Sequence, residues 1–332
     1  MSRRQLTIHI GAHKCGSSSF QEMLTDNAAG LSAQGVRYVE AGRSDSTNHH
    51  RLVRTIENGT GPKASRIPPA AQKRIQADFW SELESSEEER LVISSEAFEH
   101  LTARDDLSFF RRIRRAGFSI RTLFFVREHV SLFNSTYVEV VRSLQCLVPI
   151  EEYFEQRSAY FSTRFSRVLR RWERFSDDLT VLEFSPAKME KFVLEEWGVA
   201  ASLPHSRAGL TAIQVEAALL YSRYVAGRDG AAPSLWDHLD FHDNITLCTG
   251  ENAQGGYWGV NPTLRKLIEE CTQGDRQYLQ RQFSLTLPEA PVRQPLTITR
   301  PFDPEECREI SRVVENYIPQ KTVDEYLSAT TS

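Results

Sequence analysis

Short apolar runs alternate with longer segments of helical spacing along the first 200 residues, and this alternation constrains the fold more than any other feature. The runs rich in β-branched and aromatic residues are predicted strands, at Leu6–Ile10, Val36–Val39, Leu91–Ser94, Ile120–Val126 and Thr180–Phe184. This alternation is typical of βαβ units, whose strands form a parallel sheet flanked by helices. We therefore predict an α/β fold.

Beyond residue 200 the strand signal fades and helical spacing dominates. Helices are predicted in the first part of the chain at 17–27, 70–83, 130–144 and 160–175, and in the remainder at 212–226, 262–283 and 304–317. We expect residues 1–200 to form an α/β core. Residues 201–332 should form a mainly helical extension packed on that core, so that the chain makes one compact domain.

The charge balance and the hydropathy pattern argue against several classes of protein. The 332 residues include 40 Lys and Arg against 44 Asp and Glu, whereas a general nucleic-acid binder usually carries a basic excess. No apolar run approaches the length of about 18 residues that a membrane-spanning helix needs. The apolar segment at 6–10 is too short for a signal peptide. These features predict a cytoplasmic protein that binds neither nucleic acid nor membrane, and they leave its oligomeric state open.

The five cysteines are widely scattered, and no pair has the CxxC spacing of a zinc site. No set of His, Cys and carboxylate residues has a metal-binding spacing in the sequence either, so we predict no metal site. An odd number of scattered cysteines does not indicate a disulfide framework, which fits a reducing compartment.

The segment Gly11-Ala12-His13-Lys14-Cys15-Gly16-Ser17-Ser18-Ser19 joins the first predicted strand to the first predicted helix. The backbone N–H groups at a helix start have no partner within the helix, and together with the positive end of the helix dipole they bind anions. A glycine there lets the backbone approach a phosphate closely, and a lysine adds a positive charge. The candidate anion-binding residues are Lys14, Cys15, Gly16, Ser17, Ser18 and Ser19.

Two other interpretations of this segment exist. Its glycines at 11 and 16 have the separation found in P-loop nucleotide-binding proteins, but there the lysine directly follows the second glycine, and Ser17 stands at that position here. A nucleotide kinase or another P-loop phosphotransferase with a rearranged lysine is therefore one alternative. The other is a serine-rich helix cap that binds no ligand.

A second candidate anion site lies at the end of the predicted strand 120–126. Arg127 comes where that strand stops, at the carboxyl edge where open α/β sheets bind ligands, and Ser135 follows eight residues later inside the next helix. The guanidinium and the hydroxyl could converge on one phosphate. The alternatives are a surface salt bridge for Arg127 and a solvated helix position for Ser135.

Together, the two motifs resemble those of the sulfotransferases that use 3′-phosphoadenosine 5′-phosphosulfate (PAPS). That family carries a lysine ahead of a Gly-Thr-Thr or Gly-Ser-Ser run, as Lys14 stands ahead of Gly16, and an arginine with a serine eight residues on, as Arg127 and Ser135 stand here. The position of Cys15 is often Thr or Ser in the family. The resemblance covers roughly residues 5–30 and 90–145 and is nearest to the soluble bacterial members that modify carbohydrates.

The resemblance implies a P-loop-like parallel sheet, PAPS as the donor, 3′-phosphoadenosine 5′-phosphate (PAP) as the product, and a reaction that needs no metal. It implies that Lys14 and the N–H groups of residues 16–19 stabilise the leaving phosphate. It also implies that Arg127 and Ser135 hold the 3′-phosphate of the donor. The acceptor would be a glycan or a small molecule, sulfated on a hydroxyl or an amine, and the sequence does not identify it.

The candidate for the acceptor-side base is Glu96, at the end of the predicted strand 91–94. The resemblance implies a base at this place, a histidine in some lineages and a glutamate in others. A carboxylate there could take the proton of an attacking hydroxyl. His49 and His50, which follow a polar loop, are rival candidates as base or as acceptor ligands. The catalytic candidates are therefore Lys14, Glu96 and His50, with His49 as a further alternative.

Overall fold

A five-stranded, all-parallel sheet is the main structural element of the chain. Its strands, in the order in which they lie in the sheet, are β2 (Val36–Tyr38), β3 (Arg90–Ser94), β1 (Arg4–His9), β4 (Phe118–Val126) and β5 (Asp178–Glu183). The structure is a computed structural model, and it describes residues 4–43, 47–56, 67–101, 107–204, 209–231, 233, 238–247, 256–297 and 302–328. The predicted α/β class and parallel sheet are confirmed.

The chain divides into two compact units. The sheet unit comprises residues 1–127, 163–206 and 274–287, and the helical unit comprises residues 128–162, 207–273 and 288–332. This division differs from the predicted boundary at residue 200, because 128–162 belongs with the later helices and 274–287 returns to the sheet unit. Hydrophobic periodicity identifies a helix but does not indicate which other helices share its core, and this is the physical reason for the difference.

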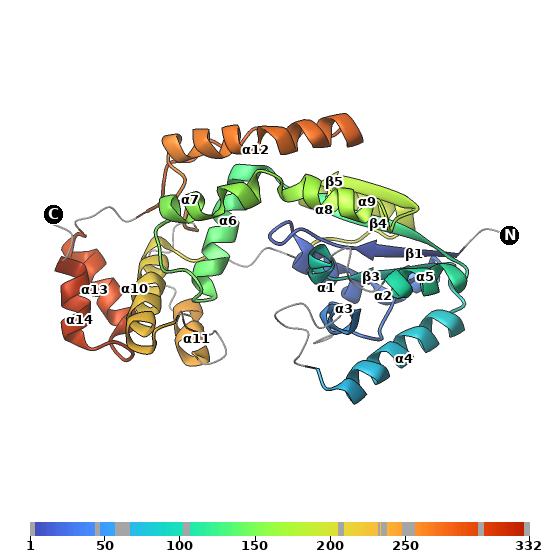
Figure 1. Cartoon of the computed structure of the whole chain (residues 1–332), viewed down its shortest axis with the longest axis horizontal. Helices are drawn as coiled ribbons and strands as arrows, with labels where there is room; N and C mark the ends of the chain where they lie inside the picture. Colours follow the sequence, from blue (N-terminus) through green and yellow to red (C-terminus); the bar gives the residue numbers. More distant parts are fainter. Residues whose placement is uncertain are drawn as a thin grey trace. The chain divides into compact units, whose positions relative to one another are not determined.

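In the sheet unit, β1 pairs with β3 on one side and with β4 on the other. The last residue of β1, His9, lies opposite Ser94 of β3 and Leu123 of β4. All strands run in the same direction, so the segments that follow β1, β3 and β4 leave the sheet at one carboxyl edge (Figure 1). This edge is where parallel α/β sheets bind their ligands.

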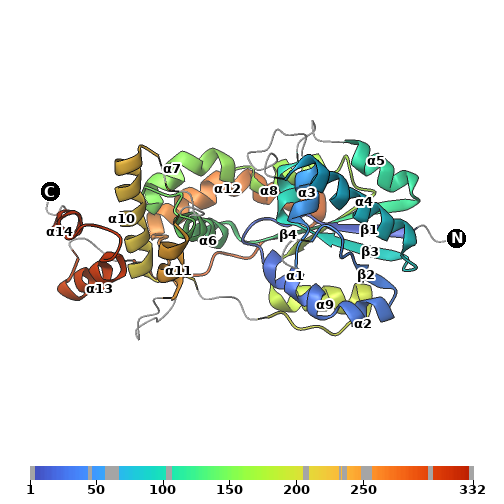
Figure 2. The same cartoon turned by 90° about the horizontal axis from the view of Figure 1, so that it is seen from below.

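Helices cover both faces of this sheet (Figure 2). One face carries α1 (Ser17–Asp26), α2 (Ala28–Ala33) and α9 (Pro186–Trp197). The other face carries α3 (His50–Ile56), α4 (Pro69–Ser85), α5 (Leu107–Arg115) and α8 (Arg164–Trp172). A 3₁₀ helix, η2 (Glu96–His100), follows β3 at the carboxyl edge. Because both faces are covered, β4 is fully buried from Leu123 to Val126.

Aromatic side chains fill the core on both faces of the sheet. On the α1 face, Phe20 packs against Trp197 of α9 and against Phe125 of β4, with ring centroids 6.2 and 5.1 Å apart. On the opposite face, Trp172 packs edge-on against Phe110 at 5.6 Å and lies 5.5 Å from Phe175. Burial of such rings stabilises the fold mainly by removing apolar surface from water.

The helical unit contains α6 (His129–Arg142), α7 (Ile150–Phe161), α10 (Ala212–Asp229), α11 (Leu239–Leu247), α13 (Pro304–Val314) and α14 (Gln320–Ser328). α10 packs against α6, α11, α13 and α14. Its first turn is closed by a capping box between Thr211 and Gln214, and Tyr221 stacks on Phe241 of α11. The helix α12 (Pro262–Phe283) belongs to both units: its residues up to Gln273 are part of the helical unit, and those from Gly274 are part of the sheet unit.

The predicted helix over 160–175 is wrong as a single element. The structure has α7 ending at Phe161 and α8 beginning at Arg164, with Ser162 and Thr163 between them. The backbone amides of Phe165 and Ser166 donate to the buried carboxylate of Asp275, at 2.9 and 2.8 Å, so a side chain far along the chain supplies the cap for α8.

No helix among the described residues is long and apolar enough to cross a membrane.

We predict that Leu24→Ala lowers the free energy of unfolding by about 2–5 kcal/mol, the usual cost of removing a buried leucine side chain. Leu24 of α1 is fully buried. Leu194 of α9 is the matched control, because it is 51% exposed and its truncation should cost less than about 1 kcal/mol. Urea unfolding of both variants measures the difference. Equal losses would contradict the core described above.

Candidate active site

The segment between β1 and α1 has an unusual backbone conformation. Gly11, Lys14 and Gly16 have φ angles of 32°, 66° and 79°, in the left-handed region that residues other than glycine rarely adopt. A lysine held in this conformation stores strain, and such strain concentrates at functional sites. The Cys15 amide donates to the Ala12 carbonyl at 3.1 Å, which closes the turn just ahead of α1.

Gly16 is required at its position by two independent constraints. Its φ angle disfavours a side chain, and a Cβ atom there would lie 1.9 Å from the ring of Phe184, just after β5. Gly11 is constrained in the same way, because a Cβ atom there would lie 2.4 Å from Ser17 Oγ and 3.2 Å from Glu96 Cγ. The hydroxyl of Ser17 and the side chain of Glu96 therefore lie next to the same glycine.

The predicted serines lie on the first turn of α1. The N-cap residue is Gly16, which has no side chain, so no side-chain hydrogen bond caps the start of this helix. Ser17 is 3% exposed, and its Oγ atom has no hydrogen-bond partner among the described residues. Ser18 is exposed and Ser19 is half-buried. A buried hydroxyl without a partner at an uncapped helix start is the arrangement that an anion would complete.

Cys15 differs from its neighbours Lys14 and Gly16, which are only half-buried. Its side chain is fully buried, and burial raises the pKa of the thiol to about 12. Its N–H is already donated to Ala12. The contact between Cys15 and a ligand stays a prediction, while its small apolar side chain suits a buried position.

Arg127 lies directly after β4 and contacts the same segment. Its Nη1 atom donates to the Lys14 carbonyl at 3.3 Å, and its guanidinium lies 5.9 Å from the ring of Phe184. The neighbouring Glu128 caps α6 by accepting from the amides of Val130 and Ser131. Glu128 is thus committed to the first turn of α6.

Ser135 lies on α6 of the helical unit and is half-buried, whereas Arg127 is the last residue before that unit begins. The two residues therefore belong to different units. Their joint role in holding one phosphate stays a prediction.

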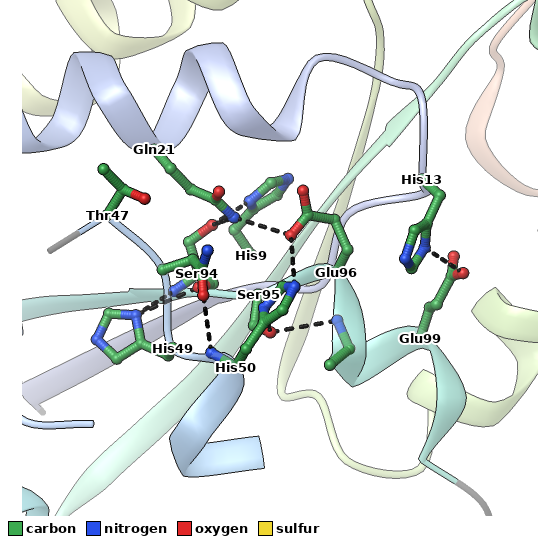
Figure 3. A network of polar contacts seen from close by, with 12 residues as sticks. His9, His13, Gln21, Thr47, His49, His50, Ser94, Ser95, Glu96 and Glu99 are labelled. Carbon is green, nitrogen blue, oxygen red and sulfur yellow. Dashed lines mark hydrogen bonds and ion pairs between the residues drawn. The ribbon is translucent and has the colours of Figure 1, made fainter. Parts of the chain in front are cut away.

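Glu96, the candidate base, begins η2 and is held from α1 (Figure 3). The Gln21 side-chain amide donates to both Glu96 Oε2 and Ser94 Oγ, at 3.1 Å each. The Ser94 hydroxyl lies 2.6 Å from Nδ1 of His9, which is fully buried. Burial lowers the pKa of His9 to about 4, so this histidine is neutral at neutral pH. The Glu96 side chain itself is 12% exposed.

His50, the other catalytic candidate, lies beside Glu96. Its Nε2 atom is 3.8 Å from Glu96 Oε2, and its Nδ1 atom is 2.7 Å from Ser95 Oγ. The His50 side chain is 31% exposed, so it can meet a ligand. The structure thus brings two of the predicted catalytic groups into one pair at the carboxyl edge, with Ser95 orienting the imidazole.

His49 has a different role. It is fully buried, its Nε2 atom lies 2.9 Å from the Val39 carbonyl, and its Nδ1 atom accepts from the Ser94 amide at 3.1 Å. Burial lowers the pKa of His49 to about 3. A neutral imidazole that joins the ends of β2 and β3 is structural, so the geometry favours His50 over His49 as the reactive histidine.

His13, just before Lys14, makes a contact that ties this segment to η2. Its Nδ1 atom lies 2.6 Å from Oε1 of Glu99, whose Oε2 accepts from Arg164 Nη2 at 2.9 Å. Burial alone would raise the pKa of Glu99, but Arg164 and His13 outweigh that effect and lower it to about 2. Glu99 is therefore an anion that anchors His13 next to Lys14.

Sequence reasoning missed Gln21, Ser94, Ser95, Glu99 and Phe184. One signal was present for Gln21: it lies four residues after Ser17 on the same face of α1, so both side chains point to the same edge. The other residues gave no such signal, because each acts through a partner that is distant in the sequence.

No protein-family model, no curated protein and no solved structure matches the chain.

We predict that Gly16→Ala displaces the segment before α1 and lowers the free energy of unfolding by more than Gly35→Ala does. Gly35 is the matched control, since its φ angle of 70° is similar but no atom lies within 4 Å of an added Cβ. The control should therefore report the backbone strain alone, about 1–2 kcal/mol. Urea unfolding of the two variants measures the difference, and equal losses would refute the close packing of Phe184 on Gly16.

Proposed function

We propose that this protein is a PAPS-dependent sulfotransferase, which transfers a sulfuryl group to a hydroxyl or amine of a glycan or small-molecule acceptor and releases PAP. The proposal includes a P-loop-like role for the segment before α1, with Lys14 and Gly16–Ser19 around the donor's phosphates. The single observation that carries it is the hydrogen bond between α1, the helix that this segment opens, and the candidate base. Gln21, one turn into the anion-binding helix, donates to Glu96 at 3.1 Å.

The donor side is supported by the electrostatics of the segment. The start of α1 directs backbone N–H groups and the positive end of the helix dipole toward an anion, and Lys14 and Arg127 add two cations. The buried Ser17 hydroxyl offers a further donor. A leaving phosphate gains negative charge in the transition state, and donors already held in position stabilise that charge most effectively.

The proposed reaction is an in-line displacement at sulfur. The acceptor oxygen forms a bond to sulfur while the bond from sulfur to the bridging phosphate oxygen breaks. PAP leaves with that oxygen and its electron pair, and the acceptor proton passes to a base. Positioning and charge stabilisation carry most of the catalysis, as in phosphoryl transfer.

Glu96 is the proposed base, with His50 as its partner. The carboxylate is fixed by Gln21, and the imidazole 3.8 Å away is oriented by Ser95. This arrangement allows Glu96 to take the proton while His50 binds the acceptor. A base held within reach of the acceptor is worth about 10²–10⁴-fold in rate.

Binding of two nucleotides, PAP and ATP, tests the identity of the donor. We predict that PAP binds the protein tightly and ATP does not, as measured by calorimetry. Arg127→Ala should weaken PAP binding by about 2 kcal/mol, the value of a charge-assisted pair, and should weaken adenosine 5′-phosphosulfate much less, because that nucleotide lacks the 3′-phosphate.

Arg121→Ala is the control for this experiment. Arg121 lies on the same strand but pairs with Glu196 at 2.6 Å, so its loss should leave both affinities unchanged. An equal loss for both nucleotides in Arg127→Ala would mean that Arg127 only supports the Lys14 carbonyl. Tight ATP binding would favour the P-loop phosphotransferase instead.

Kinetic measurements with labelled PAPS and a panel of acceptors test which residue is the base. We predict that Glu96→Gln keeps PAP affinity but lowers kcat by about 10²-fold or more, since the amide is isosteric and cannot accept the proton. His50→Ala should mainly raise the KM of the acceptor. A Glu96→Gln enzyme with normal kcat beside an inactive His50→Ala enzyme would reverse the two roles.

A further inference from the structure

His13, Glu99 and His100 form a group that neither the sequence pattern nor the proposed reaction uses. They offer three ligand atoms within 4.8 Å of one another: one nitrogen from each imidazole and one carboxylate oxygen. His13 and Glu99 are separated by 86 positions in the chain, so no spacing motif could have indicated the group. Two imidazoles and one carboxylate are the protein ligands of many open zinc sites.

The distances suit a transition-metal ion with only small side-chain movements. Oε1 of Glu99 lies 2.6 Å from Nδ1 of His13 and 3.5 Å from Nε2 of His100. Ligand atoms of a tetrahedral zinc ion lie about 3.3 Å apart, given bonds of about 2.0–2.2 Å. The side chains of His13 and His100 are 47% and 59% exposed, so an ion can reach them from solvent.

The surroundings of the group hold its ligands in position. Glu99 is buried, and Nη2 of Arg164 lies 2.9 Å from its Oε2 and 3.2 Å from its Oε1, so Oε1 is directed toward the two histidines. Arg171 donates to the carbonyls of Glu99 and Leu101, at 3.0 and 2.6 Å, and so fixes the backbone on both sides of His100. Hydrogen-bonded carboxylates and fixed backbones are typical supports of metal ligands.

We propose that His13, Glu99 and His100 bind one divalent transition-metal ion of the zinc type. Imidazole nitrogens select zinc, cobalt, nickel and copper ions, whereas Mg²⁺ prefers oxygen ligands throughout. The ion replaces the direct contact between His13 and Glu99 and connects the segment before Lys14 to η2. The positive charge of Arg164 beside Glu99 opposes a second cation, which limits the affinity.

The test is equilibrium dialysis of the tag-free, full-length protein against Zn²⁺ alone, with Mg²⁺ in a parallel experiment. We expect one saturable equivalent of Zn²⁺ and none of Mg²⁺. His13→Ala and His100→Ala should each weaken Zn²⁺ binding by about tenfold or more. Co²⁺ should give the visible absorption of a tetrahedral site, and this absorption should be lost in both variants. None of these measurements depends on enzymatic activity, so they stand apart from the proposed function.

His242→Ala is the matched control, because His242 also lies beside a carboxylate, 3.4 Å from Asp243, but has no third ligand within the described residues. Its Zn²⁺ binding should equal that of the unaltered protein. Glu99→Gln is avoided because it would leave Arg164 buried without its anion and could unfold the chain. The absence of a Zn²⁺ equivalent, an equivalent that survives both histidine replacements, or equal binding of Mg²⁺ would overturn the proposal.

Discussion

The parallel pairing of β1 with β3 and β4 is the constraint on which the candidate site depends. Hydrogen bonds of the sheet place His9 opposite Ser94 and Leu123, so the segments after these strands start from one edge. Side chains separated by more than 80 positions, such as His9 and Ser94, then come within hydrogen-bond distance. Because the sheet is buried on both faces, this edge is where its loops can meet a ligand.

Behind the exposed groups of the site lies a buried polar layer that holds them. Gln21 connects α1 to Glu96, His49 connects the ends of β2 and β3, and Arg164 neutralises Glu99. Low local dielectric makes each of these contacts strong when it is satisfied and costly when it is broken. The layer therefore holds the start of α1, Glu96 and His13 in fixed positions at the carboxyl edge of the sheet.

Much of the fold and part of the site could be predicted from the sequence. The five strands and the start of α1 followed from local apolar runs and from the glycine and serines at 16–19, which act through the backbone near them. The break between α7 and α8 could not be predicted, because Asp275 supplies the cap from more than 100 residues away. The same limit applies to Cys15 and His49, whose burial is set by neighbours from other elements.

The sequence by itself determined the α/β class, the strand–turn–helix segment around Lys14 and the candidates at Glu96, His50 and Arg127, because these depend on local periodicity and on residue chemistry at strand ends. Only the tertiary structure decided that His50 pairs with Glu96, that His49 and Cys15 are core residues, and that His13 meets Glu99 and His100. The physical reason is that burial and pairing are set by residues far apart in the chain. Local sequence specifies which side chains are present at an edge, while packing specifies which of them face one another.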